Sequence, residues 1–368
     1  MIVFRGPRQS VTAAGRATKS KSRPTIHDVA RLAGVSIGTV SKALNGGGKL
    51  RDDTRSRVQQ AAKQLAFRPN EMALSLHRGR SLTIGLISRD NFGRFGLPIM
   101  EGLEECMADQ SIAVFMCNAT DDPAREARHL ESLLSKQVDG IVVTARRSDP
   151  RPKLELPAGS LPVIYVYAQA DDADALCLVP DDEGGARQAT EHLIRLGRRR
   201  IAHVTGPEAF EAVRLRRAGY RQALANAGLA CRADFCLPGR WSESWGRQVV
   251  DELFHQAGTR PDAFVCGSDQ IARGVADALR ERGVGVPEDV SLTGFDNWQI
   301  LAEATRPALT TVDMNLKDLG REAGRCLMEL VSGGRLKGVR RLPCSLVVRD
   351  SCGAKLLTQT QEPQRLVP

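Results

Sequence analysis

The chain has 368 residues, of which 42% are hydrophobic and 26% are charged. These values are ordinary for globular proteins and exclude a wholly disordered or fibrous chain, and the length predicts two or three compact units. The longest uncharged stretch, at 156–170, contains two prolines. Because it is shorter than the about 20 apolar residues of a membrane-spanning helix, we expect no membrane segment.

The net charge of +9 is unevenly distributed along the chain. Residues 1–82 hold sixteen lysines and arginines against four acids, a net charge of +12, whereas the remainder carries −3. This pattern predicts a basic, nucleic-acid-binding module joined to a near-neutral body. Residues 1–23 lack the apolar run of a secretory signal, so we expect a cytoplasmic protein. They are interpreted as a basic, disordered leader, either an arm that seeks DNA phosphates or the product of a mis-chosen start site.

Three short helices are predicted after this leader. Thr25 and Asp28 form a helix-start pattern, and apolar residues then follow at i, i+3, i+4 and i+7. Gly34 ends this helix, Ser36 begins a second, and the acidic pair at 52–53 opens a third. Two short helices joined by a tight glycine turn are typical of a helix-turn-helix.

The second helix presents an outer face made by Ile37, Gly38, Ser41, Lys42 and Asn45. In helix-turn-helix proteins the corresponding face enters the major groove of DNA. Lys42 can reach a guanine edge or a phosphate there, and Ile37 can contact a thymine methyl group. The alternative is an ordinary solvated helix face.

The sequence of residues 25–44, TIHDVARLAGVSIGTVSKAL, resembles the start of lactose-repressor (LacI/GalR) family transcription regulators. The match continues through Phe67-Arg68-Pro69-Asn70 and Ala73-Leu74-Ser75-Leu76 to Ile84-Gly85-Leu86. The resemblance implies a helix-turn-helix domain at 24–68, then a hinge helix and linker at 69–82. It implies that the following residues contact DNA: Thr25, Ser36, Ile37, Gly38, Thr39, Ser41, Lys42, Asn45, Asn70, Ala73 and Leu76.

The family hinge helix matches Pro69–Arg78 and orders only on operator DNA. The residue that matches Leu76 is the apolar wedge that enters the minor groove and kinks the duplex. Such a short helix is not stable in water without a partner surface, which agrees with this role. The alternative is a plain linker between domains.

Beyond residue 82 the sequence alternates short apolar runs with longer helical patterns. Predicted strands are Thr83–Ile87, Ala113–Cys117, Gly140–Val143, Val163–Val166, Ile201–Thr205, Ala263–Cys266 and Ser291–Gly294. Predicted helices are Met100–Asp109, Glu126–Lys136, Gly184–Leu196, Leu215–Ala227, Ser244–Gln256 and Asp269–Arg282. This alternation predicts an α/β body with parallel sheets, and its length favours two lobes with a ligand between them.

The resemblance implies that this body is a two-lobed, type I periplasmic-binding-protein-like domain over 83–350. The expected N-lobe covers about 83–180 and 313–341, the expected C-lobe about 181–312 and 342–350, and a tail follows at 351–368. The expected fold class is therefore an all-α helix-turn-helix domain with a hinge helix, followed by this α/β domain.

The resemblance also implies an effector pocket. Arg214 and Asp296 match residues that hold ligand hydroxyl groups, and Trp241 matches an aromatic pocket wall. The alternatives are a core role for Trp241 and a strand-end cap for Asp296. Tyr167 and Ser268 stand where an acid and an asparagine are common in the family, so a standard hexose pose is not expected. Phe95 lies in the segment at 91–98, which is expected to contact the ligand.

The sequence therefore predicts a sequence-specific regulator, a repressor of carbohydrate or polyol catabolic genes that acts as a homodimer on double-stranded operator DNA. Its effector is expected to be a sugar, sugar acid or polyol, with no cofactor, metal or membrane involved. Alternatives are a solute-binding protein of the same fold and a regulator that responds to purines or other non-sugars. An enzyme is not expected, because Gly46-Gly47-Gly48-Lys49 lacks the remaining residues of a phosphate loop and no hydrolase motif occurs.

Overall fold

The computed structural model describes residues 24–44, 49–68, 80–90, 93–157, 161–255 and 260–354. The chain forms two compact units, a head at 1–79 and a body at 80–368, and each is described by itself. The leader, the Pro69–Arg78 hinge with its candidates Asn70, Ala73 and Leu76, Asn45, and most of the tail lie outside the described residues.

The head contains the three predicted helices, α1 (Ile26–Ala33), α2 (Ile37–Leu44) and α3 (Asp52–Gln64). The Asp28 carboxylate accepts hydrogen bonds from the backbone N–H of Thr25, at 2.9 Å, and from its hydroxyl, at 2.7 Å. Gly34 ends α1 in the left-handed conformation, with φ of 64°. Helix α3 begins at Asp52, but its N-cap is Arg51 and no side chain caps it. A small core of buried valines and alanines joins the helices: Val29, Ala30, Ala33, Val40, Ala43, Val58, Ala61 and Ala62.

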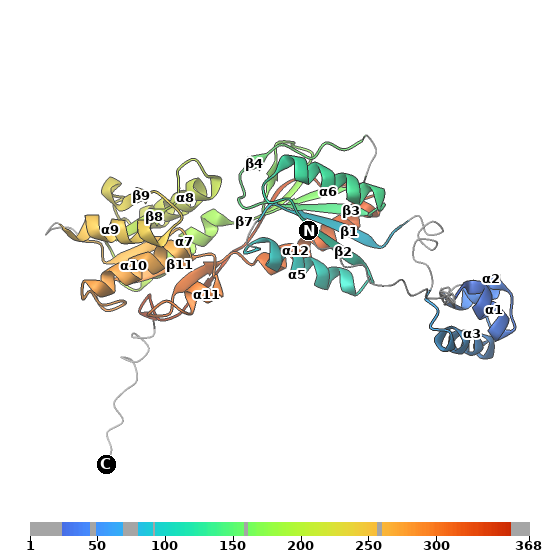
Figure 1. Cartoon of the computed structure of the whole chain (residues 1–368). Helices are drawn as coiled ribbons and strands as arrows, with labels where there is room; N and C mark the ends of the chain where they lie inside the picture. Colours follow the sequence, from blue (N-terminus) through green and yellow to red (C-terminus); the bar gives the residue numbers. More distant parts are fainter. Residues whose placement is uncertain are drawn as a thin grey trace, which may run out of the picture. The chain divides into compact units, whose positions relative to one another are not determined.

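The N-lobe of the body is a parallel sheet in the order β13-β7-β5-β3-β1-β2. Its strands are β1 (Thr83–Ser88), β2 (Ala113–Asn118), β3 (Gly140–Thr144), β5 (Val163–Val166), β7 (Leu176–Pro180) and β13 (Gly338–Leu342). Helices α5 (Gly96–Ala108) and α12 (Leu316–Val331) cover one face, and α6 (Pro123–Ser135) covers the other (Figure 1). Ile84 and Leu86 therefore pack toward α5, whereas Ile87 packs toward α6. A two-stranded ribbon, β4 (Pro150–Arg151) with β6 (Gln169–Ala170), follows β3 and β5.

The C-lobe has a second sheet in the order β14-β12-β11-β10-β8-β9, in which only β14 runs antiparallel to its neighbour. Its strands are β8 (Ile201–Thr205), β9 (Cys236–Pro238), β10 (Ala263–Cys266), β11 (Ser291–Phe295), β12 (Thr310–Asp313) and β14 (Ser345–Val347). Its helices are α7 (Asp182–Arg195), α8 (Glu211–Asn226), α9 (Glu243–His255), α10 (Asp269–Glu281) and the short α11 (Gln299–Ala302). The chain passes between the sheets after β7, after β12 and between β13 and β14, so both lobes are built from separated segments.

His203 on β8 is expected to make the stability of the C-lobe pH-dependent. The ring is 1% exposed and stacks on Tyr220 at a centroid distance of 5.1 Å, and its Nδ1 lies 3.0 Å from the carbonyl oxygen of Val265. Burial lowers the pKa of His203 to about 4. Because the unfolded chain takes up the proton near pH 6.5, the stabilising contribution of the neutral ring is present above that pH and is lost as the pH falls toward 4.

Because of His203, the unfolding free energy of the body is expected to fall by about 2 kcal/mol when the pH is lowered from 7 to 5. His203→Phe should abolish this loss. Guanidinium denaturation followed by tryptophan fluorescence reports on the body, since Trp241, Trp245 and Trp298 all belong to it. The same change at the exposed His255 should leave the pH dependence intact. An unchanged pH dependence in His203→Phe would contradict the assignment.

Candidate effector site and DNA-binding face

A buried arginine, Arg216 of α8, lies at the centre of a charged cluster in the body. Its side chain is 3% exposed, and its guanidinium lies 2.7 Å from the Asp182 carboxylate and 3.8 Å from that of Asp296. It also donates to the carbonyl oxygen of Gly267 and lies 3.6 Å from the centroid of the Phe295 ring. Burial alone would lower the pKa of Arg216, but Asp182 and Asp296 reverse this and raise it. The arginine therefore stays charged and fixes the two carboxylates.

Asp296 joins the two lobes through a second arginine. It follows β11 with φ of 104°, and its carboxylate pairs with Arg94, which lies in the N-lobe just before α5. Burial raises the pKa of Asp296, while Arg94 and Arg216 act in the opposite direction. Arg94 also lies 3.5 Å from Gln270 of α10, and its Nε is buried without a hydrogen-bond partner.

A third buried carboxylate, Asp269, supports this arrangement. It accepts hydrogen bonds from the Thr311 hydroxyl at 2.5 Å and from the backbone N–H of Trp298 at 2.7 Å. Burial, and then the charge of Asp296, raise the pKa of Asp269 to about 8. Asp269 thus holds in place the loop that carries both Asp296 and Trp298.

Aromatic rings surround the charged cluster. Phe95 and Tyr167 stack with centroids 4.8 Å apart, and Arg94 lies over Phe95 at 4.9 Å and over Trp298 at 4.6 Å. Burial and the nearby Asp296 raise the pKa of Tyr167, so its hydroxyl is neutral. Trp241 lies 5.9 Å from the Arg216 guanidinium. Flat rings beside fixed charges can hold a ligand that has apolar faces and polar edges.

The structure brings four predicted pocket residues to this cluster: Phe95, Tyr167, Trp241 and Asp296. The Ser268 hydroxyl instead caps α10 by accepting a hydrogen bond from Ile271 at 3.3 Å. Arg214 lies outside the cluster, because its side chain is 56% exposed and pairs with Glu211 one turn away on the same helix. Arg216 occupies the place in the cluster that was expected for Arg214. Residues two apart on an α-helix point about 200° apart, so only one of the two arginines can face the cluster.

Sequence reasoning missed Arg94, Asp182 and Asp269. Arg94 falls within 91–98, the segment expected to face the ligand, so a lone arginine there was the available signal. Asp182 and Asp269 each occupy the first position of a helix, α7 and α10, where an acid is commonly only a partner of the helix dipole. Nothing local marks them as members of a buried ion cluster.

The outer face of α2 is available for DNA contact in the head considered by itself. Ile37 is 42% exposed, Gly38 and Lys42 are also exposed, and Thr39 and Ser41 are half-buried. The Ser36 hydroxyl accepts a hydrogen bond from the backbone N–H of Thr39 at 3.2 Å, so Ser36 begins the helix. Direct base contacts by these residues stay predictions.

Lys42→Ala should weaken DNA binding without affecting the fold. The side chain is exposed and carries one positive charge on the outer face of α2. Loss of one phosphate contact is expected to reduce the slope of log affinity against log salt by about 0.9. Fluorescence anisotropy on a duplex at several salt concentrations measures this slope. Lys63→Ala, which removes an exposed lysine from the end of α3, is the control, and equal slopes in the two variants would contradict a contact specific to Lys42.

The body and head together define a class of protein, a helix-turn-helix domain followed by a two-lobed α/β domain. The family model for bacterial regulatory proteins of the lacI family matches residues 25–70, and a periplasmic-binding-protein-like domain matches residues 190–352. The transcriptional regulator DegA of Bacillus subtilis (strain 168) is 32% identical over 338 residues, which cover 89% of this chain and 98% of DegA. The chain belongs to the LacI family of DNA-binding transcription regulators.

Solved structures support the same assignment. A lac repressor dimer bound to operator and the anti-inducer ONPF matches with a TM-score of 0.74 and 27% identity, over 90% of this chain and 99% of that one. The transcriptional regulator CelR in complex with cellobiose matches with a TM-score of 0.62 and 30% identity, over 89% and 100% of the two chains. The predicted fold class and the predicted class of regulator are thereby confirmed.

In the described part of the chain, no helix is long and apolar enough to cross a membrane. Across the same residues, no group of three or more histidine, cysteine or acidic side chains is arranged to hold a metal ion.

Proposed function

We propose that the chain is a cytoplasmic, non-enzymatic homodimeric repressor of carbohydrate or polyol catabolic genes, and that its effector binds at the Arg216–Asp296 cluster. The observation that carries this proposal is the ion pair between Arg94 of the N-lobe and Asp296 of the C-lobe. A ligand that takes the Asp296 carboxylate from Arg94 changes the contact between the lobes. Such coupling between two sites is typically worth about 1–3 kcal/mol.

The hydrogen-bonding groups and aromatic rings of the cluster suit a polyhydroxylated ligand. Asp296 can accept hydrogen bonds from hydroxyl groups, and Arg94 and Arg216 can donate to hydroxyl or ring oxygens. Phe95, Tyr167, Trp241 and Trp298 offer faces for the C–H side of a sugar ring. The cellobiose complex of the relative CelR provides a precedent for a sugar ligand in a protein of this architecture.

A thermal-shift screen of sugars, sugar acids and polyols tests the proposal. A ligand present at a hundred times its Kd stabilises the body by about 2.7 kcal/mol. Asp296→Asn should still fold, because asparagine tolerates a positive φ, but should bind the effector at least about tenfold more weakly. Arg214→Gln serves as the control, since Arg214 lies outside the cluster and should leave affinity unchanged. Equal affinity of wild type and Asp296→Asn would refute this location.

A purine or nucleoside is the second candidate effector class. The stacked pair of Phe95 and Tyr167 favours it, because a flat heterocycle can stack beside these rings. Including adenosine, guanosine and their bases in the same screen separates the two classes, since stabilisation by these compounds alone would favour the purine reading.

A further inference from the structure

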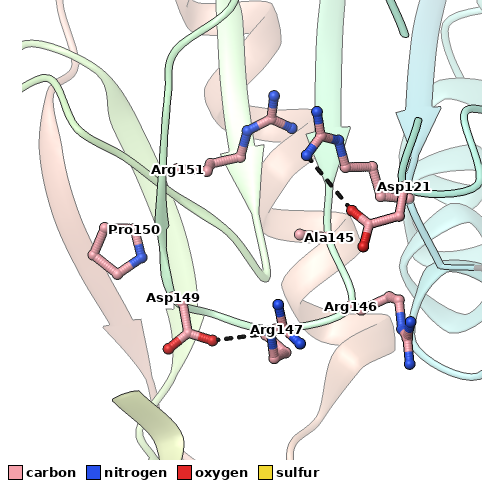
Figure 2. A pocket seen from close by; sticks show the side chains of 8 residues that line it. Asp121, Ala145, Arg146, Arg147, Asp149, Pro150 and Arg151 are labelled. Carbon is pink, nitrogen blue, oxygen red and sulfur yellow. Dashed lines mark ion pairs between the residues drawn. The ribbon is translucent and has the colours of Figure 1, made fainter. Parts of the chain in front are cut away.

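A basic pocket lies at the carboxyl ends of three neighbouring N-lobe strands (Figure 2). Arg89 follows β1, Asp121 follows β2, and the stretch 145–151 follows β3. The pocket has a volume of about 90 Å³. Since about 10–15 Å³ is enough for one water molecule, it has room for a group of several heavy atoms. The carboxyl ends of parallel strands are where ligands of α/β folds bind.

Positive charge is in excess around this pocket. Four arginines line it against two aspartates: Arg89, Arg146, Arg147, Arg151, Asp121 and Asp149. Asp121 lies 3.6 Å from Arg89, and Asp149 lies 3.2 Å from Arg147. The buried Glu126 of α6 pairs with both Arg89 and Arg151 and offsets one further charge. One net positive charge therefore remains after every carboxylate is counted.

Two of these arginines have donors to spare. Arg146 is exposed and forms neither an ion pair nor a hydrogen bond with any residue that the structure describes. The side chain of Arg151 is 11% exposed, and its Nη1 is buried without a hydrogen-bond partner. An unsatisfied guanidinium donor in a buried setting is costly, and an anionic oxygen is its best acceptor.

The pocket also adjoins the contact between the lobes. Arg147 lies over the Phe210 ring at 4.5 Å, and Asp149 accepts a hydrogen bond at 2.7 Å from the backbone N–H of Glu211. Phe210 and Glu211 begin α8, the helix that carries Arg216. The pocket therefore contacts the start of the helix that carries Arg216, and none of its lining residues belongs to the Arg216–Asp296 cluster.

We propose that this arginine pocket binds the anionic group, phosphate or carboxylate, of a small metabolite. Arg146 and Arg151 supply the free donors, and Arg147 turns from Asp149 toward the anion. The planar guanidinium groups suit two parallel hydrogen bonds to a phosphate or carboxylate. None of the residues that line the pocket belongs to the Arg216–Asp296 cluster, so the proposal holds whether the effector bound at that cluster is a sugar or a purine.

Isothermal titration of the full-length chain with inorganic phosphate, glucose 6-phosphate, gluconate and glucose tests this proposal. Arg146→Gln should weaken anion binding at least about tenfold, because it removes one charge-assisted contact. Arg335→Gln removes the same charge from an exposed N-lobe arginine outside the pocket, so it should bind anions as wild type does. Both variants alter exposed side chains, and an unchanged tryptophan denaturation curve shows that they fold.

Binding of phosphate and glucose 6-phosphate with Arg146-dependent affinity supports a phosphate site, and binding of gluconate alone, with an affinity that also depends on Arg146, supports a carboxylate site. Equal losses in Arg146→Gln and Arg335→Gln would show unspecific charge attraction and overturn the proposal, as would the absence of anion binding by wild type. Asp296→Asn should keep anion binding, because Asp296 does not line the arginine pocket. This variant therefore distinguishes a failure of the effector proposal from a failure of the anion-site proposal.

Discussion

Arg216→Met is expected to cost the body about 3–5 kcal/mol of unfolding free energy. Arg216 is 3% exposed and lies 2.7 Å from Asp182, whose side chain is 1% exposed. Methionine can fill much of the space, but it leaves Asp182 buried without its counter-ion. It also frees the carbonyl oxygen of Gly267 from its hydrogen bond. An uncompensated buried carboxylate costs far more than the attraction between the two charges contributes in the intact pair.

Guanidinium denaturation followed by tryptophan fluorescence measures this loss. Arg214→Met is the matched control on the same helix, and because Arg214 is exposed its effect should stay within about 0.5 kcal/mol. Adding Asp182→Asn to Arg216→Met should restore part of the lost stability, since it removes the unpaired charge. Equal losses from Arg214→Met and Arg216→Met would contradict the buried cluster.

Gly219→Ala is expected to destabilise the body by about 3 kcal/mol, at the upper end of the overpacking range. Gly219 lies on α8 where that helix meets α7, and an added methyl group would overlap the carbonyl oxygen of Glu183. The neighbour is backbone, so the clash is relieved only by moving α8 away from α7. Asp182 begins α7, so the same movement separates Asp182 from Arg216.

At an unobstructed helix position the same substitution stabilises a protein by about 0.5–1 kcal/mol, so the predicted sign is informative. In Gly219→Ala, both the unfolding free energy obtained from denaturation curves and the affinity for the effector should fall. Ala218→Ser alters the adjacent exposed residue by a single atom and should change neither quantity. A more stable Gly219→Ala variant would show that the two helices do not approach this closely.

Much of the fold could be predicted because its signals are local. Each predicted strand forms within one residue of its expected bounds, since short apolar runs between helical patterns mark buried parallel strands. Helix α5 begins at Gly96 rather than at the predicted Met100. The prediction missed this first turn because Gly96–Pro98 carry no apolar periodicity. Strand β13 is absent from the prediction for a related reason, since Gly338-Val-Arg-Arg-Leu342 is an edge strand with exposed arginines and lacks an apolar run.

Helix α12 is also absent from the prediction, although its sequence carries a usable signal. Leu316, Leu319, Ala323 and Leu327 lie on one helical face and are buried against α5. The close approach of the two helices at Gly102 and Gly320 brings together residues more than 200 positions apart. No local pattern specifies which distant helix fills that place.

The candidate site divides in the same way. Asp296, Trp241, Tyr167 and Phe95 could be found because they stand beside recognisable motifs. To choose correctly between Arg214 and Arg216, one would have to know which side of α8 faces the sheet. The partner of Asp296 is Arg94, which lies 202 positions away in the sequence. Pairings of this kind depend on the packing of two lobes and cannot be read from spacing along the chain.

The central claim is that a ligand bound in the body changes the affinity of the head for DNA. It is tested most directly by selecting an operator from random duplexes and measuring its affinity by anisotropy, with and without the compound that stabilises the body. We predict a change in affinity of about 5–150-fold in the saturated wild type, and a smaller change in Asp296→Asn than in the wild type at a compound concentration near the wild-type Kd. An operator affinity that is the same in wild type with and without a tightly bound compound would contradict the claim.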